Sequence, residues 1–193
     1  CTVMATLAGP APRIGAGQRD LAVRQQGALA ARDGRIVWVG PDRELDQAVT
    51  ISPAAVTLDA EGAAVLRGFV DAHTHLAYAG DRDDEIRRRL AGASYREIAE
   101  SGGGIVRSVD ATRAASVADL ANAIGARLDE MLLLGTTTAE VKSGYGLSTE
   151  SELRSLEAIR AAAEHHPVTF VPTFLGAHEV PVEHRSDRQR YVA

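Results

Sequence analysis

The sequence predicts an α/β protein in which a small all-β module, residues 1–66, precedes a larger unit, residues 67–193, of alternating strands and helices. Short strand-like segments separated by turn residues fill the first part. In the second part, long amphipathic segments separate apolar, β-prone ones. Of the 193 residues, 45% are hydrophobic and 24% are charged, which is the composition of an ordinary globular protein with a buried core.

The first module is predicted to be a small β-sandwich. Its clearest signal is Asp33-Gly34, a dipeptide typical of tight hairpin turns, which stands between two apolar segments. A second turn is expected at Gly40-Pro41-Asp42. Strands are expected at residues 2–7, 28–31, 35–39 and 63–66.

The second unit is predicted to contain three parallel strands. Residues 69–76, 136–141 and 168–174 are apolar and rich in β-branched side chains, with little alternation between apolar and polar positions. This pattern is typical of strands that are covered on both faces.

Helices between these strands are predicted from their start signals. A hydroxyl stands three residues before a carboxylate, as in a capping box, at Ser94 and Glu97, at Ser116 and Asp119, and at Thr149 and Glu152. Apolar residues then recur in steps of three or four at Val117, Leu120, Ile124, Leu128 and Met131, and at Leu153, Leu156 and Ile159. Each of these helices is expected to turn one apolar stripe toward a sheet.

This succession of strands and helices is typical of a (β/α)8 TIM-type barrel, which needs about 250 residues. Residues 67–193 are too few for a complete barrel, so the sequence predicts an incomplete barrel, its first part. The chain begins at Cys1 rather than at a methionine and stops without a helix stop signal, which indicates that both ends are cut.

His73 and His75 lie at the end of the first predicted barrel strand. Side chains two apart on a strand share a face, so the two imidazoles are expected to offer two nitrogen ligands to one divalent metal. Taken alone, such a pair is more often two hydrogen-bonded histidines without a metal. Their position at the carboxyl end of a strand, where barrels of this kind carry their chemistry, favours the metal site.

Three further side chains follow the carboxyl ends of the predicted strands: Arg82, Tyr145 and His178. Each of them, judged alone, could be a solvated or a purely structural residue. Because parallel strands end at one rim, the three are expected to converge there with the two histidines. An arginine suited to a carboxylate, a phenol between two glycines and a third imidazole together indicate a binding site.

Other candidates are interpreted as structural. Lys142 follows the second strand, whereas the carboxylated lysine of two-metal barrels follows the fourth, so a plain lysine and a single metal are expected. His165 and His166 precede a proline at a helix end, where the helix dipole favours them. Residues 101–104 lack the Gly-Lys-Ser/Thr ending of a phosphate-binding loop and are predicted to form a mobile loop over the rim.

Composition and charge exclude several classes of partner. The net charge of −5 argues against nucleic acid or an anionic membrane as the main partner. The sequence holds neither a run of eighteen apolar residues nor a signal peptide, so no membrane partner is expected. The single cysteine, Cys1, fits a reducing compartment, which predicts a cytoplasmic protein acting on a small molecule.

With these residues assembled, the chain resembles the amidohydrolase superfamily and, within it, the hydrolases that open an imidazolone ring in histidine degradation. The resemblance extends from about Asp33 to Pro181. It rests on Gly-Phe-Val-Asp-Ala-His-Thr-His at 68–75, Gly-Asp-Arg at 80–82, Glu-Ser-Gly-Gly-Gly-Ile at 100–105, Glu-Val-Lys-Ser-Gly-Tyr-Gly at 140–146 and Pro-Thr-Phe-Leu-Gly-Ala-His at 172–178. The first segment marks only the superfamily, and the last three point to this branch of it.

The resemblance implies hydrolysis of the ring C–N bond of 4-imidazolone-5-propanoate to N-formimidoyl-L-glutamate. It implies that His73 and His75 are the first two ligands of a single zinc or iron ion. Arg82, Tyr145 and His178 are implied to hold the substrate's ring and propanoate arm, and Tyr95 to line the pocket. His178 is also the expected catalytic residue, a donor to the oxygen that gains charge. A homodimer of the full-length protein is a further expectation.

The chain also departs from the pattern of this family. Arg67 and Ala72 stand where prolines are common, which is expected to change local rigidity only. The family's other two metal ligands, a histidine and an aspartate, and its catalytic glutamate are expected beyond Ala193.

Two other readings stay open at this point. One is another cyclic-amide hydrolase or deaminase of the superfamily. The other is a catalytically silent truncated fragment whose exposed barrel edge drives association.

Overall fold

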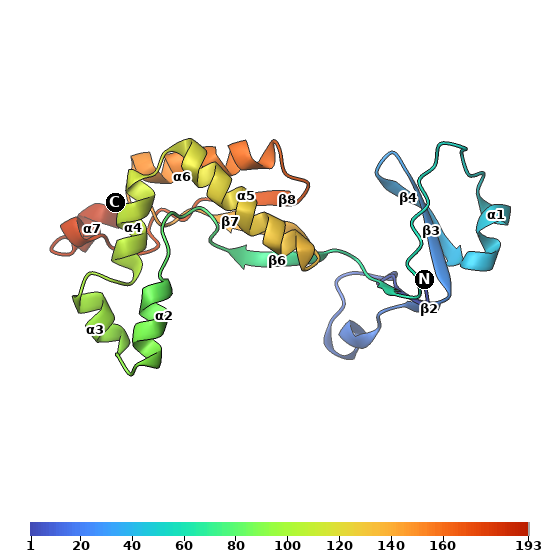
Figure 1. Cartoon of the computed structure of the whole chain (residues 1–193), viewed down its shortest axis with the longest axis horizontal. Coiled ribbons are helices and arrows are strands. Elements are labelled where there is room, and N and C mark those ends of the chain that lie inside the picture. The colour runs from blue at the N-terminus through green and yellow to red at the C-terminus, as the bar shows by residue number, and fades with distance from the viewer. Residues whose placement is uncertain (193) are drawn as a thin grey trace. The chain divides into compact units, whose positions relative to one another are not determined.

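The structure, a computed structural model, describes residues 1–192 and divides the chain into two units, Cys1–Arg67 and Gly68–Ala193 (Figure 1). Helices and strands are both present, so the chain is of the mixed α/β class that the sequence predicts.

The first unit is built from short strands. Strands β1 (Val3–Ala5), β2 (Val23–Gln25) and β5 (Ala64–Val65) form a three-stranded sheet in the order β2-β1-β5. Strands β3 (Gly27–Arg32) and β4 (Arg35–Pro41) form a separate antiparallel pair. Short helical turns occupy η1 (Gly15–Arg19), η2 (Asp42–Glu44) and α1 (Leu45–Ala48).

The predicted hairpin at Asp33-Gly34 is confirmed, because these two residues alone connect β3 to β4. Their φ angles are 53° and 72°. Positive φ at both central residues is the requirement of the tight turn that suits the twist of paired strands, and glycine and aspartate accept it readily.

The second unit contains one sheet of three parallel strands. Strand β7 (Thr136–Lys142) lies between β6 (Phe69–Thr74) and β8 (Thr169–Thr173), in the order β6-β7-β8. Both pairings are parallel, so all three strands end on the same edge of the sheet. The three strands predicted from the sequence are therefore confirmed, with ends that differ by one or two residues.

Helices follow each strand of this sheet along the chain. Five of them connect the strands: α2 (Asp83–Leu90), α3 (Tyr95–Glu100), α4 (Ile105–Ala114) and α5 (Val117–Leu133) between β6 and β7, and α6 (Thr149–Ala163) between β7 and β8. After β8 follow the turn η3 (Val182–His184) and α7 (Arg188–Val192).

Two of the three predicted capping boxes are confirmed, at the start of α3 and of α5. The third is wrong. Helix α6 is capped by Ser148, whose hydroxyl accepts a hydrogen bond from the Ser151 backbone N–H at 3.3 Å. Thr149 is already the first helical residue, and the Glu152 carboxylate bonds to a loop rather than to the helix start.

The core of this unit lies between the sheet and helices α5 and α6, which Figure 1 shows side by side along one face of the sheet. Leu120, Ile124 and Leu128 of α5 are fully buried, as the predicted stripe requires. The stripe predicted for α6 is wrong at Leu153, which is 58% exposed. Small and polar side chains take the buried positions near the start of α6: Ser151, Glu152 and Ser155.

Candidate functional site

The candidate site lies where the three parallel strands end. His73 is the last residue but one of β6, and His75 follows that strand directly. Tyr145 stands in the loop after β7, and His178 in the segment after β8. The structure brings these four predicted side chains together, although more than a hundred positions separate the first from the last in the sequence.

His75 is at the centre of this cluster. Its ring centroid lies 4.7 Å from that of His178, in a stacked arrangement, and 5.4 Å from that of His73. Between the two histidines, Thr74 turns inward and donates a hydrogen bond to the Glu140 carbonyl. The imidazoles of His73 and His75 therefore lie next to each other, as the spacing predicts.

The electrostatics of His75 favour a neutral ring. Burial lowers the pKa of His75, and the nearby His178 and His73 lower it further. Its Nδ1 atom is buried without a hydrogen-bond partner among residues 1–192. A buried polar atom normally has a partner, so this nitrogen has a lone pair or an N–H group ready for a ligand.

Tyr145 closes one side of the cluster. Its ring centroid is 5.6 Å from the rings of both His75 and His178, and 5.7 Å from that of Tyr78. The Tyr78 ring in turn stacks under the Arg127 guanidinium, 3.6 Å from its centroid. Burial raises the pKa of Tyr145, so its phenol keeps its proton at neutral pH and can donate a hydrogen bond.

The orientation of His178 is set by the backbone. Its Nδ1 lies 2.9 Å from the carbonyl oxygen of Gly144. Because a carbonyl only accepts, Nδ1 must carry the hydrogen, and Nε2 of the neutral ring is left as an acceptor. His178 can therefore donate from Nε2 only as an imidazolium, a condition that the sequence did not reveal.

Gly144 allows this close contact. Its φ of +117° lies in the region that favours glycine, and a Cβ atom at this position would lie 3.1 Å from both Cβ and Nδ1 of His178.

Arg82 precedes α2 and is linked to the cluster through its charge. Its Nε atom donates a hydrogen bond to Glu85 Oε2 at 2.7 Å, and its Nη2 atom forms an ion pair with the same oxygen at 2.6 Å. This hydrogen bonding raises the pKa of Arg82, and the Arg82 charge acts against the effect of burial on the pKa of Tyr145. Tyr95, the first residue of α3, is mostly exposed, and its place in the pocket stays a prediction.

Glu85 was not predicted from the sequence. It is almost fully buried, and its Oε1 atom accepts a hydrogen bond from the Gly104 backbone N–H at 2.7 Å. Hydrogen bonds from Arg82 and Gly104 lower the pKa of Glu85. The glycine-rich segment 101–104 is thus attached to α2 at Gly104, where α4 begins.

Lys142 is part of a polar group at the end of β7, close enough to His75 for its charge to lower the pKa of that histidine. Its ammonium pairs with the Glu140 carboxylate, which also accepts a hydrogen bond from Thr173 Oγ1 at 2.7 Å. These contacts lower the pKa of Glu140, with Lys142 the largest cause. That Lys142 is a plain lysine beside a single metal stays a prediction.

The residues present fit part of a metal site. The two adjacent imidazoles and the unpartnered Nδ1 of His75 suit two ligand positions. Zinc sites in proteins usually have four ligands, of which a catalytic site takes three from the protein. Among residues 1–192, no group of three or more histidine, cysteine, aspartate or glutamate side chains is arranged to hold a metal ion.

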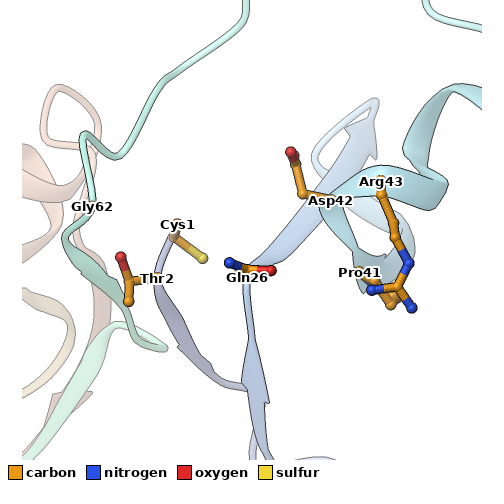
Figure 2. Close-up of a pocket in the computed structure, with 7 residues that line it drawn as sticks. All are labelled: Cys1, Thr2, Gln26, Pro41, Asp42, Arg43 and Gly62. Atoms are coloured by element: carbon orange, nitrogen blue, oxygen red, sulfur yellow. The ribbon is translucent and has the colours of Figure 1, made fainter.

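A hollow of about 410 Å³ in the first unit is unrelated to this cluster (Figure 2). Its walls are Cys1, Thr2, Gln26, Pro41, Asp42, Arg43 and Gly62, none of which the sequence predicts to be functional. The Cys1 thiol there donates to the Gly27 carbonyl at 3.0 Å.

None of the helices described is both long and apolar enough to pass through a membrane.

Comparison with known proteins shows which relatives the chain is similar to. No protein-family model matches it. It is 58% identical over 189 residues to the imidazolonepropionase of Symbiobacterium thermophilum, a match that covers 98% of this chain and 44% of the relative. It is 51% identical over 184 residues to the imidazolonepropionase of Halobacterium salinarum, covering 95% of this chain and 43% of the relative. The imidazolonepropionase of Chloroflexus aggregans is 46% identical over 192 residues, which are 99% of this chain and 44% of the relative.

These relatives are hydrolases of the amidohydrolase class. The chain belongs to the imidazolonepropionase family, and it spans about 44% of the length of the curated relatives it matches.

A stability measurement tests the contacts of Glu85. Its folded-state pKa is lowered, so the carboxylate stabilises the fold at pH above its ordinary value of about 4.3, and this contribution disappears as the pH falls through the lowered folded value. At neutral pH, Glu85→Gln is expected to reduce the free energy of unfolding by about 1.5–3 kcal/mol, the effect of losing hydrogen bonds between charged groups. The difference from wild type should shrink as the pH falls below the ordinary carboxyl pKa and through the lowered folded value.

Urea unfolding at a series of pH values measures this difference. Glu157→Gln, at an exposed position on α6, is the control and should change little. A Glu85→Gln deficit that is independent of pH would contradict the assignment of Glu85 as a paired carboxylate.

Proposed function

We propose that this chain is part of a metal-dependent hydrolase that cleaves the ring C–N bond of 4-imidazolone-5-propanoate and forms N-formimidoyl-L-glutamate in histidine degradation. The observation on which the proposal depends is the cluster of His73, His75, Tyr145 and His178 at one edge of a parallel sheet. The names of the relatives support the choice of substrate. The activity belongs to the whole protein, because the chain spans less than half of each relative.

His73 and His75 are the proposed ligands of one zinc or iron ion. The neutral ring favoured by the lowered pKa of His75 is the form that binds a metal. An ion held there would lower the pKa of a bound water toward neutrality and so supply a nucleophile at neutral pH. The remaining ligands and the proton-transfer group come from parts of the protein outside residues 1–192.

Arg82 is proposed to bind the propanoate carboxylate. Glu85 occupies the Nε and Nη2 edge of the guanidinium, and the edge between Nη1 and Nη2 remains available for a second carboxylate. The side chain is 38% exposed, so a ligand can reach it. Because Glu85 fixes the plane of the guanidinium, the orientation of the bound carboxylate is fixed as well.

Tyr145 and His178 are proposed to act on the substrate's ring. The protonated phenol of Tyr145 donates a hydrogen bond to the ligand. His178, with Nδ1–H held by Gly144, donates from Nε2 as an imidazolium to the carbonyl oxygen that gains negative charge. His178 is thus both a substrate-binding and a catalytic residue in this proposal.

The finer architecture is also a proposal. The parallel sheet is taken as the first part of a (β/α)8 TIM-type barrel, residues 67–193, which the exposure of apolar side chains such as Phe69, Val70 and Val171 on its outer strands supports. Residues 1–66 are taken as a small β-sandwich. A cytoplasmic location, supported by the single cysteine, and a homodimer of the full-length protein stay predictions.

The activity is tested in a chimera in which this chain replaces the matched segment of the Symbiobacterium thermophilum relative. The chimera is expected to convert 4-imidazolone-5-propanoate to N-formimidoyl-L-glutamate, measured by chromatography of the product. Dihydroorotate, hydantoin and cytosine, tested in parallel, should be poor substrates.

The 193-residue chain alone is the matched comparison. Because its described residues offer an incomplete ligand set, it is expected to be inactive. Preferential turnover of hydantoin or cytosine by the chimera would assign the site to another cyclic-amide hydrolase or a deaminase.

A second prediction concerns Arg82. Replacement by lysine keeps the charge but removes the flat fork, so Arg82→Lys in the chimera is expected to raise KM for the propanoate substrate by about 10- to 100-fold. Steady-state kinetics measures the change, and Arg87→Lys, at an exposed position on α2, is the control. Equal KM values for Arg82→Lys and wild type would exclude Arg82 from substrate binding.

A further inference from the structure

A buried carboxylate on α6 organises the loop that follows β7. The Glu152 side chain is fully buried, with 1% of its surface exposed. Its Oε2 atom accepts a hydrogen bond from the Gly144 backbone N–H at 2.7 Å. Its Oε1 atom accepts two more, from Gly146 at 2.9 Å and from Leu147 at 2.7 Å. One negative charge therefore satisfies three backbone donors of a five-residue loop.

The loop that Glu152 holds is the loop that supplies the site. Tyr145 stands between two of the residues whose N–H groups bond to the carboxylate. The carbonyl of Gly144 accepts the Nδ1–H of His178 from the neighbouring segment. Glu152 thus lies one contact away from Tyr145 and His178, two of the three proposed substrate-binding side chains, and it makes no hydrogen bond to either side chain.

The opposite side of the loop is held by a cation. Arg113 of α4 donates from Nε to the Gly146 carbonyl at 2.6 Å and from Nη2 to the Leu147 carbonyl at 3.1 Å. Three backbone donors of the loop therefore bond to an anion, and two of its carbonyl acceptors bond to a guanidinium. Bonds of this kind, with one charged partner, are about twice as strong as neutral ones.

The close approach of the loop to α6 requires glycine at position 146. A Cβ atom there would lie 2.7 Å from the carbonyl carbon of Ser151, at the start of α6. The absence of a side chain lets the loop backbone approach the helix closely enough for the Gly146 N–H to reach the carboxylate.

Capping of the helix does not explain Glu152. Ser148 already supplies the N-cap of α6. The three hydrogen-bond donors to the Glu152 carboxylate all belong to the loop, and none of them is an N–H group of α6.

We infer that Glu152 is a positioning residue for the substrate site: it sets the conformation of residues 143–147, and through them the placement of Tyr145 and the tautomer and orientation of His178. The role in substrate binding rests on the proposed function. The effect on the loop and on His178 does not.

The kinetic test uses Glu152→Gln in the chimera, with Glu157→Gln on the exposed side of α6 as the matched control. The amide of glutamine offers one acceptor oxygen and turns an NH2 group toward a backbone N–H, so the loop loses part of its support. Glu152→Gln is expected to lower kcat/KM by about 10- to 100-fold, and the control to leave it unchanged.

A double-mutant comparison separates positioning from a general loss of stability. Tyr145→Phe should lower kcat/KM in the wild-type background and have little further effect in the Glu152→Gln background, because Tyr145 is already displaced there. Fully additive effects of the two substitutions would overturn the inference.

A ligand-free readout decides the case independently of activity. In protein labelled with 15N-histidine, NMR reports which ring nitrogen of His178 carries the hydrogen. At a pH at which the ring is neutral, wild type and Glu157→Gln are expected to show hydrogen at Nδ1 only, and Glu152→Gln a mixture of tautomers. Unchanged Nδ1–H in folded Glu152→Gln protein would overturn the inference.

Failure of the proposed function is distinguishable from failure of this inference. A wild-type chimera without activity on imidazolone propanoate contradicts the function and leaves the tautomer measurement valid. If Glu152→Gln does not fold, Glu152→Asp, which keeps the charge on a shorter side chain, is measured with the same expectations. Failure of both variants to fold would overturn the inference in favour of a purely structural role.

Discussion

The parallel pairing of β6, β7 and β8 is the constraint on which the candidate site depends. Because all three strands run in the same direction, the residues that follow them meet at one edge of the sheet. His75, Tyr145 and His178 come from three different strand ends and still lie within ring-contact distance. Helices α5 and α6 hold this pairing by covering one face of the sheet with fully buried aliphatic side chains.

Two buried carboxylates, Glu85 and Glu152, fix the conformation of loops near the site. Glu85 joins Arg82 to the backbone of Gly104, and Glu152 joins α6 to the loop that holds Tyr145. In each case a buried carboxylate accepts hydrogen bonds from loop N–H groups or from a guanidinium, and the low polarity around it strengthens these bonds. Stability and site geometry thus depend on the same contacts in both places.

Much of this arrangement is predictable from the sequence, because strands and helices leave local patterns. The Asp33-Gly34 turn, the β-branched strands and the capping serines of α3 and α5 are examples. The N-cap residues of α2 and α4 are Arg82 and Gly104, and neither caps its helix through a side-chain hydrogen bond in the described structure. The sequence therefore carries no capping signal for the starts of these two helices. The partners of Glu152 could not be predicted either: the spacing from Thr149 suggested a capping box, and only the fold brings the glycine loop to the carboxylate.

The most direct test of the account is the proximity of the site's rings in solution. Nuclear Overhauser contacts between ring protons of His75, Tyr145 and His178 are predicted, since their centroids lie 4.7 to 5.6 Å apart. The measurement needs neither metal nor substrate. Observed contacts among all three rings would support the shared edge of the parallel strands. In a folded chain, a complete lack of contacts between His178 and the other two rings would contradict it.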